Sequence, residues 1–330
     1  MGTPGPFERH PRENIAMPHA HPSQAAPLPA LSGRPASAWT VWGAVLLWLI
    51  PQVTWAGAIT LGSISLEPAA EVKKFWPLAH YLAQQLQPEG IDHGRVEVAD
   101  SIRQMAAFVR EGKVDLFLDS PFPVLAVSRL SGSRLLLRRW KKGVADYQAV
   151  MFARQDSGIS RVEDLQGKMI AFEEPFSSTG YFLPKLVLMQ AGMQVVPKRE
   201  AADPVGREEV GYVFSGTDES TMVWVLRGIV AAGAMDHHRL PIEAKGSLRS
   251  LKIIYETVAI PRHIVSARAD LPPPLVARIH DILRHMDQSE EGKAALQAFE
   301  GTTKFDDIPE HALALLSNAI SLIDAEVGRR

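Results

Sequence analysis

From Ile59 onward, short apolar runs alternate with stretches of helical periodicity, and this alternation constrains the fold more than any other feature of the chain. The runs "ITLGSIS" at 59–65 and "KMIAFEE" at 168–174 have the length and composition of strands. Between such runs, 71–87 and 101–110 place apolar residues at helical spacing. Strands that alternate with helices predict an α/β fold in which helices cover a sheet.

The remaining pattern extends this arrangement over the whole chain. We expect further strands at 95–100, 115–119, 147–154, 211–216, 229–235 and 251–260, and helices at 181–192, 219–228 and three times after Pro272. The long strands at 147–154 and 251–260 each lead from one βα series into another. They predict two crossings between two lobes, with a cleft between the lobes. The expected segments are 1–58 as an N-terminal extension, 59–150 as the first part of lobe 1, 151–254 as lobe 2, and 255–330 as the rest of lobe 1 with C-terminal helices.

Composition narrows the class of protein. Of the 330 residues, 46% are hydrophobic, which is enough for one large or two medium domains. The 35 Lys and Arg residues nearly balance the 37 Asp and Glu residues, so no overall field favours nucleic acid, and any anion specificity must be local. The absence of cysteine excludes disulfides, thiol nucleophiles and cysteine metal sites.

The first 58 residues differ from the rest. A twelve-residue apolar run at 39–50 follows the positive charge of Arg34, and "AGA" at 56–58 fits a small-residue cleavage site. We therefore expect a cleavable signal peptide, export to the periplasm, and a mature chain that begins near Ile59, with Met17 as a possible initiator. The alternative is an uncleaved membrane anchor, because no charge occurs between Arg34 and Glu67.

The segment "EEPFSSTGYFLPK" at 173–185 follows a strand and precedes a helix. The start of a helix presents unpaired backbone N–H groups and the positive end of its dipole. Ser177, Ser178 and Thr179 add hydroxyl donors, Gly180 allows close backbone approach, and Tyr181 opens the helix. This pattern predicts an anion-binding site without a metal or permanently positive side chains. The alternative is simple N-capping, for which one hydroxyl is enough.

A second strand-to-helix junction, "FSGTDEST" at 214–221, repeats the arrangement with Thr217 and Asp218. Asp218 would repel a fully ionised oxyanion but would suit a protonated oxyanion or an ammonium group. The alternative is that Asp218 only caps its helix, since aspartate is a preferred cap. Asp236 directly follows the strand at 229–235 and has the same two interpretations.

Five segments together resemble the type 2 periplasmic binding proteins, in particular the phosphate, phosphite and phosphonate binding components of ABC importers. They are "PLAHYLAQQL", "VREGKVDLFLDSP", "SGISRVEDLQGKMIAFEEPFSSTGYFLP", "VFSGTDESTMVWVLRGIV" and "DQSEEGKAALQAF", and the similarity covers 59 to about 305. The resemblance implies two α/β lobes that close over a small anion. It also implies a monomeric, non-catalytic binding protein without a cofactor, which delivers its ligand to a membrane permease.

Some positions depart from the family pattern. Asp218 stands where the family commonly has histidine, and Leu66 and Val124 stand where it often has tyrosines. Asp236 matches an acidic family position near the ligand, where it could receive the amine of an aminophosphonate. Ser65 and Ser120 remain as polar candidates in lobe 1, each also readable as an ordinary loop residue.

Two alternatives to an importer component remain open. One is a ligand sensor that docks on a membrane receptor or kinase with the same pocket. The other is an enzyme on the same scaffold, although Ser178 has no identifiable histidine partner in the sequence. The adjacent His237 and His238 do not share a helical face and predict no metal site. The basic stretch "RLLLRRWKKG" at 134–143 could steer anions toward the cleft, but basic residues are common on solvent-facing edges, and we expect it to form a solvent-facing edge.

Overall fold

The computed structural model describes residues 57–318, 323–324 and 328. Its first sheet has the strand order β14-β4-β13-β3-β1-β2, with β1 parallel to both of its neighbours and β13 antiparallel to both of its own. These strands are β1 (Gly57–Ile64), β2 (Ile91–Ala99), β3 (Leu116–Asp119), β4 (Arg134–Lys141), β13 (His263–Ala267) and β14 (Thr302–Asp306).

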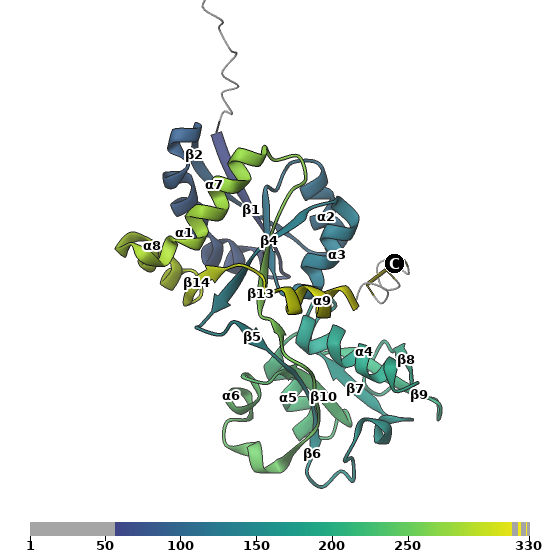
Figure 1. The fold of residues 1–330 in the computed structure, drawn as a ribbon. Coiled ribbons are helices and arrows are strands. Elements are labelled where there is room, and N and C mark those ends of the chain that lie inside the picture. Colours follow the sequence, from purple (N-terminus) through teal and green to yellow (C-terminus); the bar gives the residue numbers. More distant parts are fainter. Residues whose placement is uncertain (1–56, 319–322, 325–327, 329–330) are drawn as a thin grey trace, which may run out of the picture. The chain divides into compact units, whose positions relative to one another are not determined.

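Helices cover both faces of this sheet (Figure 1). Leu116 and Leu118 of β3 share a core with Leu78 of α1 and Ile279 of α7, whereas Phe117 lies in the core on the opposite face. This alternation is what a strand between two helical layers requires, since successive side chains point to opposite faces. The covering helices are α1 (Pro68–Gln85), α7 (Pro273–Arg284) and α8 (Glu290–Ala298) on one face, and α2 (Ile102–Arg110) and α3 (Pro121–Ser131) on the other.

The second sheet has the order β11-β6-β10-β7-β9-β8 and is also covered on both faces. Ile170 and Phe172 pack toward α4 (Leu183–Gln190), whereas Met169 and Ala171 pack toward α5 (Asp218–Leu226) and α6 (Leu240–Ala244). Its strands are β6 (Ala149–Arg154), β7 (Met169–Phe172), β8 (Gln194–Pro197), β9 (Glu209–Phe214), β10 (Ala232–Asp236) and β11 (Leu251–Glu256). We call the first sheet with its helices the first lobe, and the second sheet with its helices the second lobe.

The chain passes between the two sheets twice. It leaves the first sheet after β4 and returns at β13, and the two passes pair with each other as β5 (Asp146–Tyr147) and β12 (Ile260–Pro261). All strands of the second sheet therefore come from one continuous segment, while the first sheet takes strands from before and after it. This arrangement confirms the predicted α/β fold with two lobes.

The three helices expected after Pro272 are present as α7, α8 and α9 (Glu310–Asn318).

Other elements differ from the sequence-based expectation. Helix α3 was not predicted, because its prolines at 121 and 123 resemble a turn, although proline in the first helical turn removes no intrahelical hydrogen bond. Strands β4, β8, β13 and β14 were also missed, and two of these have edge positions that require little apolar patterning.

The predicted signal peptide and the possible initiator Met17 lie outside the described residues, which begin at Gly57. Gly57 and Ala58 of the "AGA" site belong to β1, where Gly57 pairs with Ile91. Within the described part of the chain, no helix combines the length and apolarity needed to cross a bilayer.

Candidate functional site

A cavity of about 470 Å³ lies between the lobes, and we call it the cleft. Both lobes and both passes contribute to its wall, and most of the lining side chains are polar or charged. Seven of the residues predicted from the sequence line it, namely Ser65, Ser120, Ser177, Ser178, Thr179, Asp218 and Asp236. The structure thus brings together predicted residues that are up to 171 positions apart, from Ser65 to Asp236.

The segment 177–182 reaches the cleft as a single helical turn that is wider than an α-helical turn. Ser177 is the N-cap, and its hydroxyl accepts a hydrogen bond from the N–H of Gly180 at 2.9 Å. Residues 178–182 form a π-helical turn that continues directly into α4. Ser178 and Thr179 are the first residues of this turn, so their backbone N–H groups have no partner inside the helix. Together with the hydroxyl of Thr179 they form an arrangement that suits an anion.

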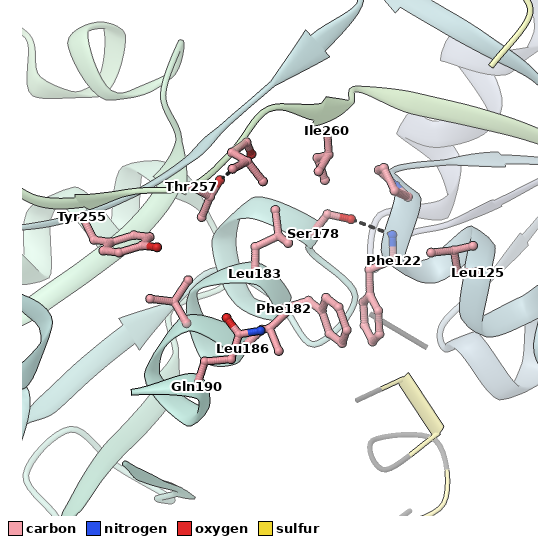
Figure 2. A pocket seen from close by; sticks show the side chains of 13 residues that line it. Phe122, Leu125, Ser178, Phe182, Leu183, Leu186, Gln190, Tyr255, Thr257 and Ile260 are labelled. Carbon is pink, nitrogen blue, oxygen red and sulfur yellow. Dashed lines mark hydrogen bonds between the residues drawn. The ribbon is translucent and has the colours of Figure 1, made fainter. Parts of the chain in front are cut away.

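Ser178 also connects the two lobes. Its hydroxyl accepts a hydrogen bond from the N–H of Phe122 and donates one to the hydroxyl of Ser120, both at 2.9 Å. The ring of Phe122 stacks on that of Phe182 with 3.7 Å between ring centroids, and Figure 2 shows the two rings facing each other beside Ser178. Part of the predicted donor set is therefore engaged in holding α3 against the segment 178–182.

A smaller cavity of about 270 Å³ lies on the other side of Ser178 (Figure 2). Its wall is mostly apolar and includes Leu125, Leu183, Leu186 and Val258. Its composition contrasts with that of the cleft, so the two cavities are suited to different chemistry. Ser178 lines both cavities.

Three predicted site residues are not among those that line the cleft. A side chain at Gly180 would place its Cβ 2.6 Å from the Cβ of Glu173, so the glycine accommodates Glu173 rather than a ligand. Tyr181 is buried among Phe172, Tyr212 and Phe214, and its hydroxyl accepts a hydrogen bond from Lys185 at 2.8 Å. Thr217 is the N-cap of α5, where it accepts a hydrogen bond from the N–H of Ser220 at 3.0 Å.

The two predicted aspartates of the second lobe face cations. Asp218 accepts a hydrogen bond from Arg239 at 3.2 Å, and Asp236 accepts one from Arg262 at 2.6 Å. Asp218 is not the cap of α5, because Thr217 has that role. Asp236 also accepts a hydrogen bond from the N–H of His238 at 2.9 Å. Each carboxylate is therefore partly neutralised before any ligand enters.

The aromatic side chains of the cleft come from positions that the sequence did not indicate. Leu66 is 61% exposed and does not line the cleft, and Val124 is buried inside the first lobe. Phe75, Tyr147 and Phe176 supply aromatic surface instead. Ser65 does line the cleft, with its hydroxyl accepting a hydrogen bond from the N–H of Glu67 at 3.0 Å.

The expectation of a solvent-facing edge at 134–143 is wrong. Strand β4 lies between β14 and β13, so it is an interior strand, and Arg139 is only 1% exposed. Arg139 and Lys141 line the cleft, as do Arg239 and Arg262. The hypothesis that the site lacks permanently positive side chains is wrong for the same reason. The adjacent arginines at 138–139 were the sequence signal for cations in the site. Their burial follows only from the pairing of β4 with β14, which the sequence does not show.

Four carboxyl groups of the cleft have raised pKa values, and Asp218 is one of them, with a pKa of about 6. Burial is the main cause in each case, and it raises the pKa of Asp119 to about 7 and that of Glu174 to about 7. Burial, together with the nearby charge of Asp218, also raises the pKa of Glu173. Near neutral pH these groups are partly protonated, and a protonated carboxyl group can donate a hydrogen bond to an anion.

Among the residues that the structure describes, no three His, Asp or Glu side chains lie together in a way that could hold a metal ion. His237 pairs with Glu256 at 2.8 Å. His263 lines the cleft, and burial beside Lys141, Arg139 and Arg262 lowers its pKa well below the usual value. It is therefore neutral at physiological pH.

Comparison with known proteins gives consistent matches. Residues 61–312 match the family model described as "ABC transporter, phosphonate, periplasmic substrate-binding protein". The phosphate-import protein PhnD of Mycolicibacterium smegmatis is 26% identical over 232 residues, which are 67% of this chain and 69% of that protein. The solved structure of XAC2383 from Xanthomonas citri, bound to chloride ion, is 26% identical with a TM-score of 0.76, covering 82% of this chain and 98% of that one.

A further match is to a signalling protein. The tetrathionate sensor histidine kinase TtrS of Salmonella typhimurium is 30% identical over 158 residues, or 46% of this chain. The match spans about a quarter (26%) of the length of that kinase.

Proposed function

Because the chain belongs to the family of periplasmic substrate-binding proteins of phosphonate ABC transporters, which are not catalysts, we propose that it captures a small phosphorus oxyanion or organophosphonate in the cleft. The protein would work as an exported monomer that delivers this ligand to a membrane permease. Closure of the lobes by bending at the two passes would be stabilised only by contacts that the ligand makes to both lobes.

The observation that carries this proposal is the position of Ser177, Ser178 and Thr179 at the wall of the cleft, at the start of a helical turn. Backbone N–H groups at a helix start favour a negative group without requiring permanent charge, which allows reversible binding. A hydrogen bond to a charged partner is worth about 1.5–3 kcal/mol, so a few of them are in the range of micromolar affinity before ordering costs.

The cleft has basic side chains that suit an anionic ligand, although its seven carboxyl groups outnumber its six basic side chains. Arg139, Lys141, Arg239 and Arg262 line it, and the partly protonated Asp119 and Glu174 add possible donors. Two relatives have names or titles that refer to anions, phosphate for the mycobacterial protein and chloride for XAC2383. A second XAC2383 structure, 25% identical to this chain, is described as bound to ATP.

A sensor that docks on a membrane receptor or kinase is the second candidate function. It is favoured by the 30% identity to a segment of a sensor histidine kinase. The two functions share the cleft and differ in the partner. Loss of ligand uptake in cells that lack the protein supports import, whereas unchanged uptake with an altered transcriptional response supports sensing.

Thermal-shift measurements with phosphate, phosphite, methylphosphonate, aminoethylphosphonate and sulfate test the ligand class. A ligand at about 100 times its Kd should stabilise the folded protein by about 2.7 kcal/mol. Thr179→Ala should remove most of that shift without unfolding the free protein, whereas the exposed Thr303→Ala should not change it. A panel in which no phosphorus compound raises the melting temperature would contradict the proposal.

A further inference from the structure

The first lobe contributes four basic side chains and three carboxyl groups to the cleft wall, whereas the segment 177–179 lies in the second lobe. The basic side chains are Lys74, Arg139, Lys141 and Lys142, and the carboxyl groups are those of Glu71, Asp119 and Glu300. Arg139 and Lys141 belong to β4, and His263 begins the neighbouring strand β13, where it pairs directly with Arg139. These three side chains all line the cleft. The pairing of β4 with β13 therefore places Arg139, Lys141 and His263 together on the first lobe. The helical turn at 178–182 belongs to the second lobe.

The charges in this group do not balance. Glu300 accepts from Arg139 at 3.1 Å and from Lys141 at 2.9 Å, so one carboxylate serves two cations. The next cation, Arg262, is paired with Asp236, and His263 is neutral. Burial lowers the pKa of Arg139 to about 10 and lowers that of Lys141, and the neighbouring carboxylate of Glu300 offsets this effect only in part. One further negative charge would complete the group.

Two polar atoms beside this group also lack partners. Nδ1 of His263 and Nε of Arg262 are buried and make no hydrogen bond within the described part of the protein. A buried polar atom without a partner costs about 1–3 kcal/mol, so native proteins usually satisfy such atoms. Both atoms belong to residues that line the cleft, so the wall beside Arg139 and Lys141 retains unused hydrogen-bonding capacity.

A structural role explains only part of this arrangement. Arg139 stacks on Phe299 at 3.7 Å from the ring centroid and donates to the hydroxyl of Thr302 at 2.8 Å, so it anchors the segment before β14. Lys141 is bonded to Glu300 and has no such set of anchoring contacts among the described residues. Lys141 is therefore the residue whose charge can be tested without dismantling the fold.

The size of the cleft points the same way. Its volume of about 470 Å³ is more than phosphate, with its five heavy atoms, would fill. We propose that Lys141 and Arg139, with His263 beside them, form a second anion-binding site in the cleft, and that the ligand class is a small molecule with an anionic group at each end. This inference rests on the proposed function, since the first anionic group is the one placed at 177–179.

Two ligands of equal length test the inference by calorimetry at pH 7. Propylphosphonate carries one anionic group, and 3-phosphonopropionate carries a carboxylate at the other end. The protein should bind 3-phosphonopropionate at least about tenfold more tightly, as expected for one additional charged contact. Lys141→Gln should reduce this ratio to about threefold or less, mainly by weakening the binding of 3-phosphonopropionate. Lys245→Gln, which removes an exposed charge paired with Glu219, is the matched control and should keep the full ratio.

The outcomes separate this inference from the proposed function. Equal affinity for the two phosphonates would overturn the second site while leaving the phosphonate function intact. A preference that persists in Lys141→Gln would also overturn the assignment to this wall. If neither phosphonate binds, the binding of ethane-1,2-disulfonate, which also has an anionic group at each end, is measured with the unmodified protein and with Lys141→Gln. Binding of this disulfonate that Lys141→Gln weakens would support the second site and contradict the phosphorus ligand, and absence of binding would overturn both.

Discussion

The hydroxyl oxygen of Ser178 lies 2.9 Å from the backbone nitrogen of Phe122, a residue of the other lobe, and accepts its hydrogen bond. A second hydrogen bond at 2.9 Å, from Ser178 to Ser120, strengthens the same contact. Both residues of the first lobe belong to the start of α3. One side chain of the proposed anion-binding segment is therefore also a structural link between the lobes.

Ser178→Ala should lower the free energy of unfolding by about 1–3 kcal/mol, because the buried N–H of Phe122 loses its acceptor. Urea denaturation measures this change. Ser157→Ala removes an exposed hydroxyl that donates to the carbonyl of Arg154 and accepts from the N–H of Ile159 at 3.3 Å, and as the control it should have a smaller effect. Equal stability of the two variants would show that the contact between Ser178 and Phe122 contributes nothing.

Stability should depend on Asp119 in a defined pH window. The folded pKa of about 7 lies above the usual value, so the folded state binds a proton that the unfolded chain has already lost. The contribution of Asp119 to stability is therefore complete below about pH 4 and is lost as the pH rises toward 7. Glu174 acts in the same direction through its folded pKa of about 7. Glu300, with a pKa lowered to about 2, acts oppositely and only at acidic pH.

Asp119→Asn should flatten the decrease in unfolding free energy between pH 5 and pH 7 by up to about 1.4 kcal/mol per pH unit. Urea titrations at several pH values measure this slope. Asp203→Asn is the matched control, because hydrogen bonds from the N–H groups of Arg199 and Glu200 lower the pKa of that exposed carboxyl group and keep its titration below this window. A variant slope equal to that of the unmodified protein would contradict the assignment.

Asp218→Asn should increase the affinity for methylphosphonate at pH 8 by about three- to tenfold, because it removes a carboxylate that repels an ionised phosphonate. Arg239 keeps its partner Glu243 and remains in place. Calorimetry measures the change, with Glu219→Gln on the next residue as the control. A loss of affinity would instead show that Asp218 accepts a hydrogen bond from the ligand.

Arg262→Gln should lower the free energy of unfolding by about 3–5 kcal/mol, since it leaves the buried carboxylate of Asp236 without its cation. Arg278→Gln breaks the exposed pair with Glu89 and should cost less than about 1 kcal/mol. Denaturation of the two variants provides the comparison. Equal losses would indicate that the burial of the Asp236 pair has no energetic consequence.

The fold could be predicted from the sequence because its main signals are local. Apolar strands such as 168–174 and helical periodicity such as 101–110 reflect burial on one or two faces, and the structure contains strand β7 and helix α2 at these places. Strand β13 was missed because its pairing with β3 and β4 is a long-range property. Helix α3 was missed because its prolines obscured a helix start.

The site was only partly predictable for the same physical reason. Three serine and threonine residues before a helix are a local pattern, and the structure places them at the cleft. The burial of Arg139 is decided by which strands flank β4, and no local pattern contains that information. The packing of Tyr181 into the second lobe likewise depends on Tyr212 and Phe214, which are more than 30 positions away.

The two passes between the sheets are bonded to each other, not merely adjacent. Tyr147 pairs with Ile260, the N–H of Arg262 donates to the carbonyl of Ala145 at 2.8 Å, and the side chain of Gln148 donates to the carbonyl of Thr257 at 2.9 Å. A ribbon of this kind resists lengthwise shear, because sliding would break every rung, while bending across its plane preserves them. The two halves of the molecule can therefore swing about one common axis, whereas a sliding motion of one half along the other is prohibited.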